Sequence, residues 1–177
     1  DRRKGGGGYM VIIQVDDFSD VQNNVKENNI TVVWKSEHPE ARAIHLHPKE
    51  MGGAILSLDW MNPKESWKWA GPNWDECVNT STIKRFVGVE IQSDDPEEMK
   101  NTWQAVLKAP SEKVSNYQIN LDNTWIRFVK DQDGRGPGVS AFCLEANNNE
   151  ALLKKASDLG YISEKNIMIG GVKFLLS

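Results

Sequence analysis

The chain has 177 residues, of which 39% are hydrophobic and 26% are charged, and its formal net charge is −4. These values fit one globular domain or two small ones, and the lack of a basic block argues against nucleic acid as a partner. The longest apolar runs are too short to cross a membrane. The two cysteines, Cys77 and Cys143, do not make a disulfide framework, so we expect reduced thiols in a cytoplasmic protein.

Residues 1–8, DRRKGGGG, start without a methionine and have the composition of a flexible linker. We expect this segment to be a linker or the remnant of a missing N-terminal module. The first strand follows it directly.

The stretch VIIQVDDFSDVQ, residues 11–22, predicts a strand, an aspartate-rich helix cap and the start of a helix. Val21 and Val25 lie at helical spacing and would face the core. The unit ends in the apolar strand GGAILSLD. Residues 9–60 therefore hold one complete β-α-β-β-β module.

Just before that last strand, the stretch HLHPKEMGG places His45 and His47 two positions apart. On a strand, both side chains would point to one face, as two metal ligands do. The alternatives are a hydrogen-bonded turn or the wall of a cavity. A general acid or base is also chemically reasonable, because imidazole titrates near neutral pH. The residues alone leave these alternatives open.

Residues 61–84 form a connector that is rich in Trp, Pro and Asn. Trp67, Trp69 and Trp74 lie close together within it. These side chains either fix the connector to the body of the protein or form an aromatic wall over a flat, apolar ligand. Because positive charge does not surround them, they do not suit nucleic-acid stacking.

The second half of the chain repeats the first unit. VEIQSDDPEEMK, residues 89–100, aligns without gaps with residues 11–22, and residues 140–160 repeat the pattern with Asn in place of Asp. The helix residues expected to face the core are Met99, Trp103, Val106 and Leu107 in one copy, and Leu152, Leu153, Ala156 and Leu159 in the other. Gly160 follows where a left-handed C-cap is needed. We expect an α+β fold of repeated βαβββ modules, with curled mixed sheets, helices on the outer face, and two shorter paired modules in residues 85–177.

The order of strand, VDD and helix, followed by HPKxxGGxxxxL, resembles the vicinal oxygen chelate superfamily of glyoxalases, bleomycin-resistance proteins and dioxygenases. The matching residues are His47, Pro48, Lys49, Gly52 and Gly53. The stretch is most similar to the second module of methylmalonyl-CoA epimerase-like members. The resemblance implies paired glyoxalase-like modules whose curled sheets enclose a cavity. Residues 9–60 would then pair with the missing N-terminal module, whereas residues 85–177 would form their own pair.

The same resemblance implies a divalent metal, held by a His or Gln on the first strand and a Glu on the last strand of each module, which polarises a substrate with adjacent oxygens. The corresponding residues here are Met10 and Ser57, Gly88 and Arg127, and Ser140 and Leu175. None of the six is the expected residue type, and a hard divalent metal prefers carboxylates or imidazoles. We therefore predict no metal site and no other cofactor in this chain. A divalent metal would require ligands from the missing module.

Strand alternation places Gln14, Asp59, Glu90 and Gln92 on faces that would line the cavity. Glu90 and Arg127 are expected to form an internal ion pair. Alternatively, Arg127 binds a carboxylate or phosphate of a ligand. The ligand-binding candidates are Gln14, His45, His47, Asp59, Trp67, Trp69, Glu90 and Arg127. The sequence assigns no catalytic residue.

The expected function is that of a glyoxalase-like protein which binds or converts a small organic molecule in the cavity between modules, without the usual metal site. If it is an enzyme, the resemblance implies a lyase or isomerase. The alternative is a non-catalytic, metal-free binder of the bleomycin-resistance kind, with aromatic walls. The partner is then a small-molecule ligand, with neither nucleic acid nor membrane involved, and the exposed sheet edge of an unpaired module favours a homodimer.

Overall fold

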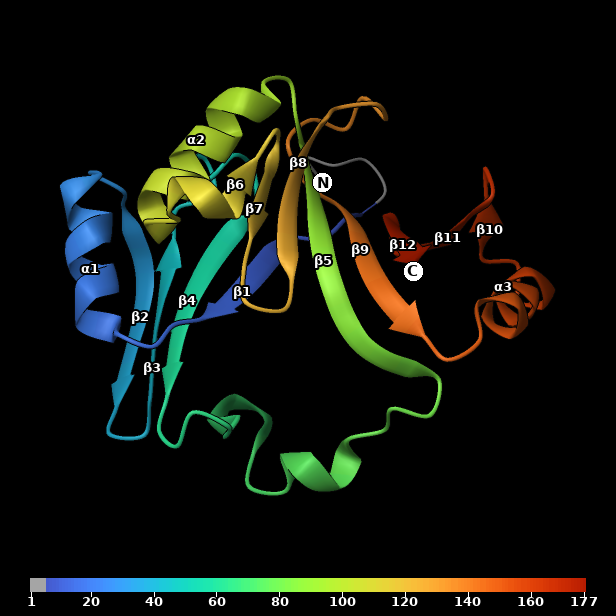
Figure 1. Ribbon diagram of the computed structural model, residues 1–177, viewed down its shortest axis with the longest axis horizontal. Coiled ribbons are helices and arrows are strands. Elements are labelled where there is room, and N and C mark those ends of the chain that lie inside the picture. The colour runs from blue at the N-terminus through green and yellow to red at the C-terminus, as the bar shows by residue number, and fades with distance from the viewer. Residues whose placement is uncertain (1–5) are drawn as a thin grey trace.

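Three copies of one β-α-β-β-β unit follow one another along the chain (Figure 1). The computed structural model describes residues 6–177, so most of the expected linker lies outside the described residues. The units build two curled mixed sheets, of four and eight strands. The α+β fold of repeated modules predicted from the sequence is confirmed.

The first unit forms the four-stranded sheet, in the order β1-β4-β3-β2. Its elements are β1 (Met10–Gln14), α1 (Phe18–Glu27), β2 (Val32–His38), β3 (Ala41–Leu46) and β4 (Ile55–Met61). Strands β1 and β4 are parallel, and the other neighbours are antiparallel. The connector follows β4 and contains two short 3-10 helices, η1 (Lys68–Ala70) and η2 (Trp74–Cys77).

The second and third units share the eight-stranded sheet, in the order β10-β11-β12-β9-β5-β8-β7-β6. The second unit consists of β5 (Ile83–Ser93), α2 (Pro96–Leu107), η3 (Ser111–Lys113), β6 (Val114–Ser115), β7 (Gln118–Asn120) and β8 (Trp125–Lys130). The third consists of β9 (Gly138–Ala146), α3 (Asn149–Asp158), β10 (Ile162–Ser163), β11 (Asn166–Ile169) and β12 (Val172–Leu176). The antiparallel pairing of β5 with β9 joins the two units.

Each helix begins at the kind of cap that the repeated motif predicts. The side chains of Asp17, Asp95 and Asn148 each accept a hydrogen bond of 2.9 Å from the backbone N–H three residues later. Such a bond satisfies a donor that the first helical turn leaves free. Gly160 has φ +76° just after α3, which confirms the expected left-handed position.

One hydrophobic core contains side chains from both sheets and from α1 and α2. These two helices contact each other (Figure 1). Trp103 of α2 is fully buried there, packs edge-on against Phe128, and donates its indole N–H to the Met51 carbonyl at 3.0 Å. This contact joins the first unit to the second. No helix of residues 6–177 combines the length and apolar character needed to span a bilayer.

The prediction for α3 is partly wrong. Ala156 is buried as expected, but Leu153 and Leu159 are 38% and 60% exposed. The reason is that α3 packs mainly against the short strand β10, and not into the core that α1 and α2 share. Helical spacing identified an apolar stripe but not whether another element covers it.

The HPK segment forms the turn between β3 and β4. The Gly53 N–H donates to the Pro48 carbonyl at 2.6 Å, and Gly52 and Gly53 both have positive φ. A side chain on Gly52 would overlap Met99 of α2. Backbone conformation therefore favours glycine at both positions, and the close approach of α2 adds to this at Gly52.

Candidate ligand-binding site

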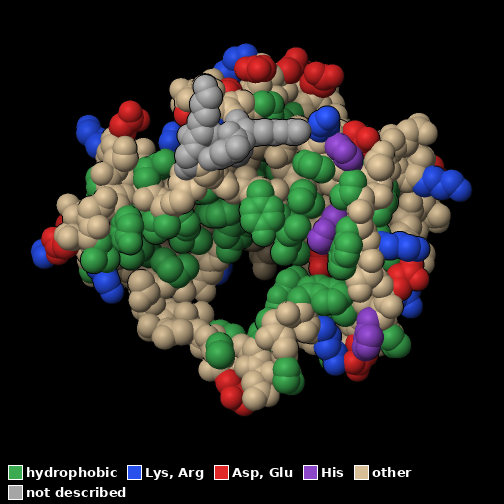
Figure 2. Space-filling model, turned by 180° about the vertical axis from the view of Figure 1, so that it is seen from behind, with side chains coloured by type: hydrophobic (Ala, Val, Ile, Leu, Met, Phe, Trp, Pro, Cys, Tyr) green, Lys and Arg blue, Asp and Glu red, His purple; other side chains and the backbone are tan. Residues whose placement is uncertain are grey.

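A cavity of about 430 Å³ lies on the face of the four-stranded sheet that is turned away from the core. It is lined by Ile12, Trp34, Ala43, His45, Ser57, Asp59, Trp67, Trp69 and Ala70. Four of these, His45, Asp59, Trp67 and Trp69, are candidates from the sequence. Figure 2 shows hydrophobic side chains bordering an opening between the connector and the body of the protein.

Strand pairing explains why these residues meet. Ser57 of β4 lies opposite Ile12 of β1 on one side and opposite His45 of β3 on the other. The next strand places Trp34 opposite His45. Because neighbouring residues on adjacent strands share a face, these side chains form one wall. The connector supplies the tryptophans that cover it.

Asp59 is the buried acid of the cavity, with only 3% of its surface exposed. One carboxylate oxygen accepts a hydrogen bond of 2.5 Å from the Ser57 hydroxyl, and the other accepts one of 2.6 Å from the Trp69 indole N–H. A buried carboxylate requires such donors. Trp69 therefore both fixes the connector and forms part of the aromatic wall, so the two alternatives from the sequence are compatible.

His45 is half-buried beside this acid, and its ring centroid lies 4.3 Å from that of Trp34. Burial lowers the pKa of His45 below its ordinary value of 6.5, although the negative charge of Asp59 acts in the opposite direction. The neutral imidazole is thus favoured at neutral pH. In this form it can donate one hydrogen bond, accept another, or take up a proton.

Gln14 and His47 lie outside the cavity. Gln14 pairs in register with Asp59, but its amide donates to the Lys64 carbonyl at 2.6 Å and so holds the connector. His47 follows the end of β3, and its Nδ1 accepts a hydrogen bond from the Lys49 backbone N–H at 3.2 Å. The two histidines therefore have different environments, a cavity wall for His45 and a hydrogen-bonded turn for His47.

Glu90 and Arg127 lie together on the eight-stranded sheet, away from this cavity. The Arg127 Nη1 is 3.2 Å from a Glu90 carboxylate oxygen, so the two side chains pair as expected, but the pair is not internal because the Arg127 side chain is 44% exposed. Gln92, two residues further along β5, is buried and donates to Asp131 and Asp133. Gln92 therefore holds the loop after β8 and does not line a cavity.

The positions where the resemblance implies metal ligands do not fit a divalent cation. In the second unit, a side chain on Gly88 would overlap the Trp125 indole, and Arg127 brings a positive charge. In the first unit, the Ser57 hydroxyl is already bonded to Asp59. Within residues 6–177, no three His, Cys, Asp or Glu side chains are arranged to hold a metal ion. The donor set therefore offers no metal-based step.

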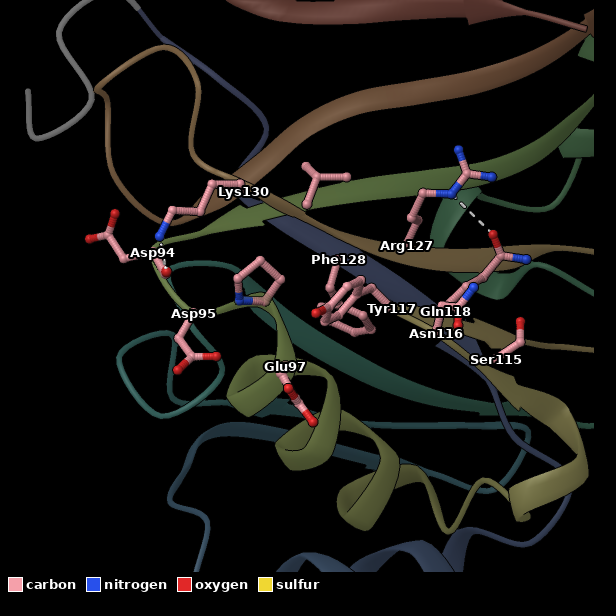
Figure 3. A pocket seen from close by; sticks show the side chains of 12 residues that line it. Asp94, Asp95, Glu97, Ser115, Asn116, Tyr117, Gln118, Arg127, Phe128 and Lys130 are labelled. Atoms are coloured by element: carbon pink, nitrogen blue, oxygen red, sulfur yellow. Dashed lines mark hydrogen bonds between the residues drawn. The ribbon is translucent and has the colours of Figure 1, made fainter.

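A larger hollow of about 750 Å³ lies at the end of β8, beside the start of α2 (Figure 3). Two of its charged side chains have structural roles: Asp95 caps α2, and Lys130 donates to the Asp94 carbonyl. Figure 3 shows the Arg127 guanidinium turned away from Tyr117 and towards Gln118. This hollow does not combine buried polar groups with an aromatic wall, as the cavity at Asp59 does.

Sequence reasoning missed Trp34, Ile12 and Ala43 as lining residues. The signal for Trp34 was weak, because the pairing of β2 with β3 shifts register between Val32 and Trp34. Simple alternation from Val32 therefore does not assign its face. Ile12 and Ala43 follow only once their strands are placed beside β4.

Comparison with known proteins supports the fold. Neither a family model nor a curated protein matches the sequence. A hypothetical protein from Staphylococcus aureus is similar in structure, with a TM-score of 0.59 and 10% identity over 94% of this chain and 63% of that chain. So is 2,2',3-trihydroxybiphenyl 1,2-dioxygenase from dibenzofuran-degrading Sphingomonas wittichii strain RW1, with a TM-score of 0.63 and 12% identity over 95% of this chain and 69% of that chain. The dioxygenase has the vicinal oxygen chelate fold.

At these identities the similarity concerns the fold alone. The chain spans 63% of the length of the first similar structure and 69% of the second. The glyoxalase-like fold expected from the sequence is therefore supported. The chemistry must be argued from the side chains of this chain.

Proposed function

We propose that the chain binds a small, flat organic molecule in the cavity at Asp59, without using a metal ion. The observation that carries the proposal is a buried carboxylate and an imidazole set in an aromatic wall. The volume of about 430 Å³ is typical of a small-molecule site. A ligand of one or two rings with a hydroxyl group suits this lining.

The lining side chains offer different kinds of interaction to a ligand. Trp34, Trp67 and Trp69 offer ring faces for stacking, and each well-placed aromatic contact contributes about 0.5–1.5 kcal/mol beyond area burial. His45 offers a neutral nitrogen that accepts a hydrogen bond from a ligand hydroxyl. Both oxygens of Asp59 are already bonded, so its role is to orient Ser57 and Trp69 and to place negative charge near His45.

Calorimetric titration with 4-phenylphenol tests the proposal. Trp67→Ala is expected to weaken binding by about three- to tenfold, because one stacking face is removed. Trp74→Ala is the matched control, since Trp74 lies in the same connector but does not line the cavity. Lack of binding by the wild-type protein at millimolar 4-phenylphenol, or equal losses in the two variants, contradicts the proposal. Thermal unfolding confirms that both variants are folded.

A second function, proton transfer, is favoured by the lowered pKa of His45. In this case the imidazole takes a proton from a bound ligand and returns it, as in a lyase or isomerase. The test is deuterium incorporation from D2O into a panel of acyl-CoA, aromatic and thiol-conjugate ligands. His45→Gln should abolish incorporation, with His47→Gln as the control. Incorporation that survives in His45→Gln excludes this base.

A further inference from the structure

Arg127 occupies a site that several side chains of the second unit build together. Its guanidinium carbon lies 4.3 Å from the centroid of the Trp125 ring, so the cation stacks on an aromatic face. Trp125 in turn lies over Gly88, where any side chain would overlap the indole. The missing side chain at Gly88 therefore makes room for the surface that supports Arg127.

Hydrogen bonds fix the direction of the guanidinium. Nη1 donates to Glu90 at 3.2 Å, and Nε donates to the side-chain oxygen of Gln118 at 3.1 Å. The Gln118 amide is itself oriented by a bond of 2.7 Å to Asn120. Among the described residues, Nη2 has no hydrogen-bond partner. The group is therefore held in one orientation with donors left for another molecule (Figure 3).

Stability alone does not account for this arrangement. The Arg127 side chain is 44% exposed, and an exposed ion pair contributes about 0–1 kcal/mol. Yet residues from β5, β7 and β8 converge to orient it. A planar guanidinium held in this way matches the geometry of a carboxylate. Arg127 also occupies the position at which the resemblance implies a metal-binding glutamate, so this position carries a positive charge.

We propose that Arg127, supported by Trp125 and oriented by Glu90 and Gln118, is an anion-binding site that takes the carboxylate of a small organic acid. The Glu90 carboxylate holds Nη1, so the free Nη2 receives the ligand, and the negative charge of Glu90 nearby weakens the attraction for a second carboxylate. The site is independent of the cavity at Asp59, which lies on the other sheet. If no ligand binds at Arg127, the proposed function of the cavity at Asp59 is unaffected.

Benzoate, with benzyl alcohol as the uncharged analogue, is the probe. Binding is followed by NMR through the Arg127 Nε–H and Trp125 indole N–H signals of the complete chain. We expect saturable shifts with benzoate only. Arg127→Gln should weaken binding by at least about tenfold. Glu90→Gln should strengthen it, because the repelling negative charge is removed while the glutamine oxygen can still accept from Nη1.

Arg42→Gln is the matched control, since Arg42 also lies over a tryptophan, Trp60, with 5.1 Å between the guanidinium carbon and the ring centroid. It should leave benzoate binding unchanged. If Arg127→Gln fails to fold, Arg127→Lys keeps the charge without the planar fork and should still lose affinity. Unchanged affinity in a folded Arg127 variant, weaker binding in Glu90→Gln, or no shift at tens of millimolar benzoate overturns the proposal. Inorganic phosphate that binds as tightly as benzoate overturns the carboxylate assignment.

Discussion

The first and second units have the same backbone plan but opposite chemistry on corresponding faces. In the first unit, β1 and β4 present the buried acid Asp59; in the second, β5 and β8 present the exposed base Arg127. The difference follows from what covers each face. The connector covers Asp59 and supplies an indole donor, whereas Arg127 stays open to water and is paired with Glu90. A repeated fold thus fixes where side chains meet, and the covering segment decides which charge can be buried there.

The comparison depends first on the core that both units share. Trp103→Ala should lower the free energy of unfolding by about 3–5 kcal/mol, because it removes a fully buried indole and the bond to Met51. Urea denaturation measures this loss, with Leu159→Ala on the exposed side of α3 as a control near zero. A single cooperative transition is expected for the wild type. Two transitions in the wild type, or a loss below about 1 kcal/mol, would show that the units do not share one core.

Removing the charged group from each face sharpens the contrast. Asp59→Ala should lower the free energy of unfolding by about 2 kcal/mol, because it leaves the Ser57 hydroxyl and the Trp69 N–H without an acceptor. Arg127→Ala should change it by less than about 1 kcal/mol, since the side chain is exposed. Chemical denaturation of both variants under one set of conditions is the measurement. Equal losses would mean that the two faces are not differently buried.

Gly88→Ala tests the support of Arg127. The new methyl group would overlap the Trp125 indole, so we expect a loss of about 1–2 kcal/mol and a displaced ring. Near-ultraviolet circular dichroism should change with it. Trp125→Phe combined with Gly88→Ala should recover part of the stability, because a smaller ring leaves space. Additive effects of the two substitutions would contradict the contact.

The smallest effect is the contribution of His45 to the pH dependence of stability. Because burial lowers the pKa of His45 in the folded protein, the unfolded chain binds the proton more tightly. The contribution of the neutral ring to stability is therefore complete above the ordinary value of 6.5 and is lost as the pH falls towards the lowered value. His45→Gln should flatten the curve of stability against pH below 6.5, relative to the wild type. Equal slopes in His45→Gln and the wild type would refute this assignment.

The sequence was most informative where the structure depends on local geometry. The repeated capping motif predicted the starts of α1, α2 and α3, because a cap needs only one side chain and the next turn. The HPK turn and its glycines were likewise local. The exposure of one face of α3 is not a local property, because burial of Leu153 depends on elements that are distant in the sequence.

The candidate site was only half predictable for the same reason. Alternation placed Asp59 on the right face, but its bond to Trp69 depends on how the connector folds back. From the sequence, Gly88 could be interpreted only as a missing metal ligand. That it leaves room for the Trp125 indole became evident only once β5 was paired with β8. The expected homodimer stays a prediction, with β1 at the edge of its sheet as its structural basis.

If the proposed binding function holds, the bond between Trp69 and Asp59 also makes the connector a size filter for ligands. A ligand too bulky to share the cavity with the indole must first break this bond, so only the open fraction of molecules can receive it. Its apparent dissociation constant then increases by the reciprocal of that fraction. A slim ligand enters without this cost. Under the proposed binding function, the tryptophan that encloses the acid thereby sets the upper size of the ligand.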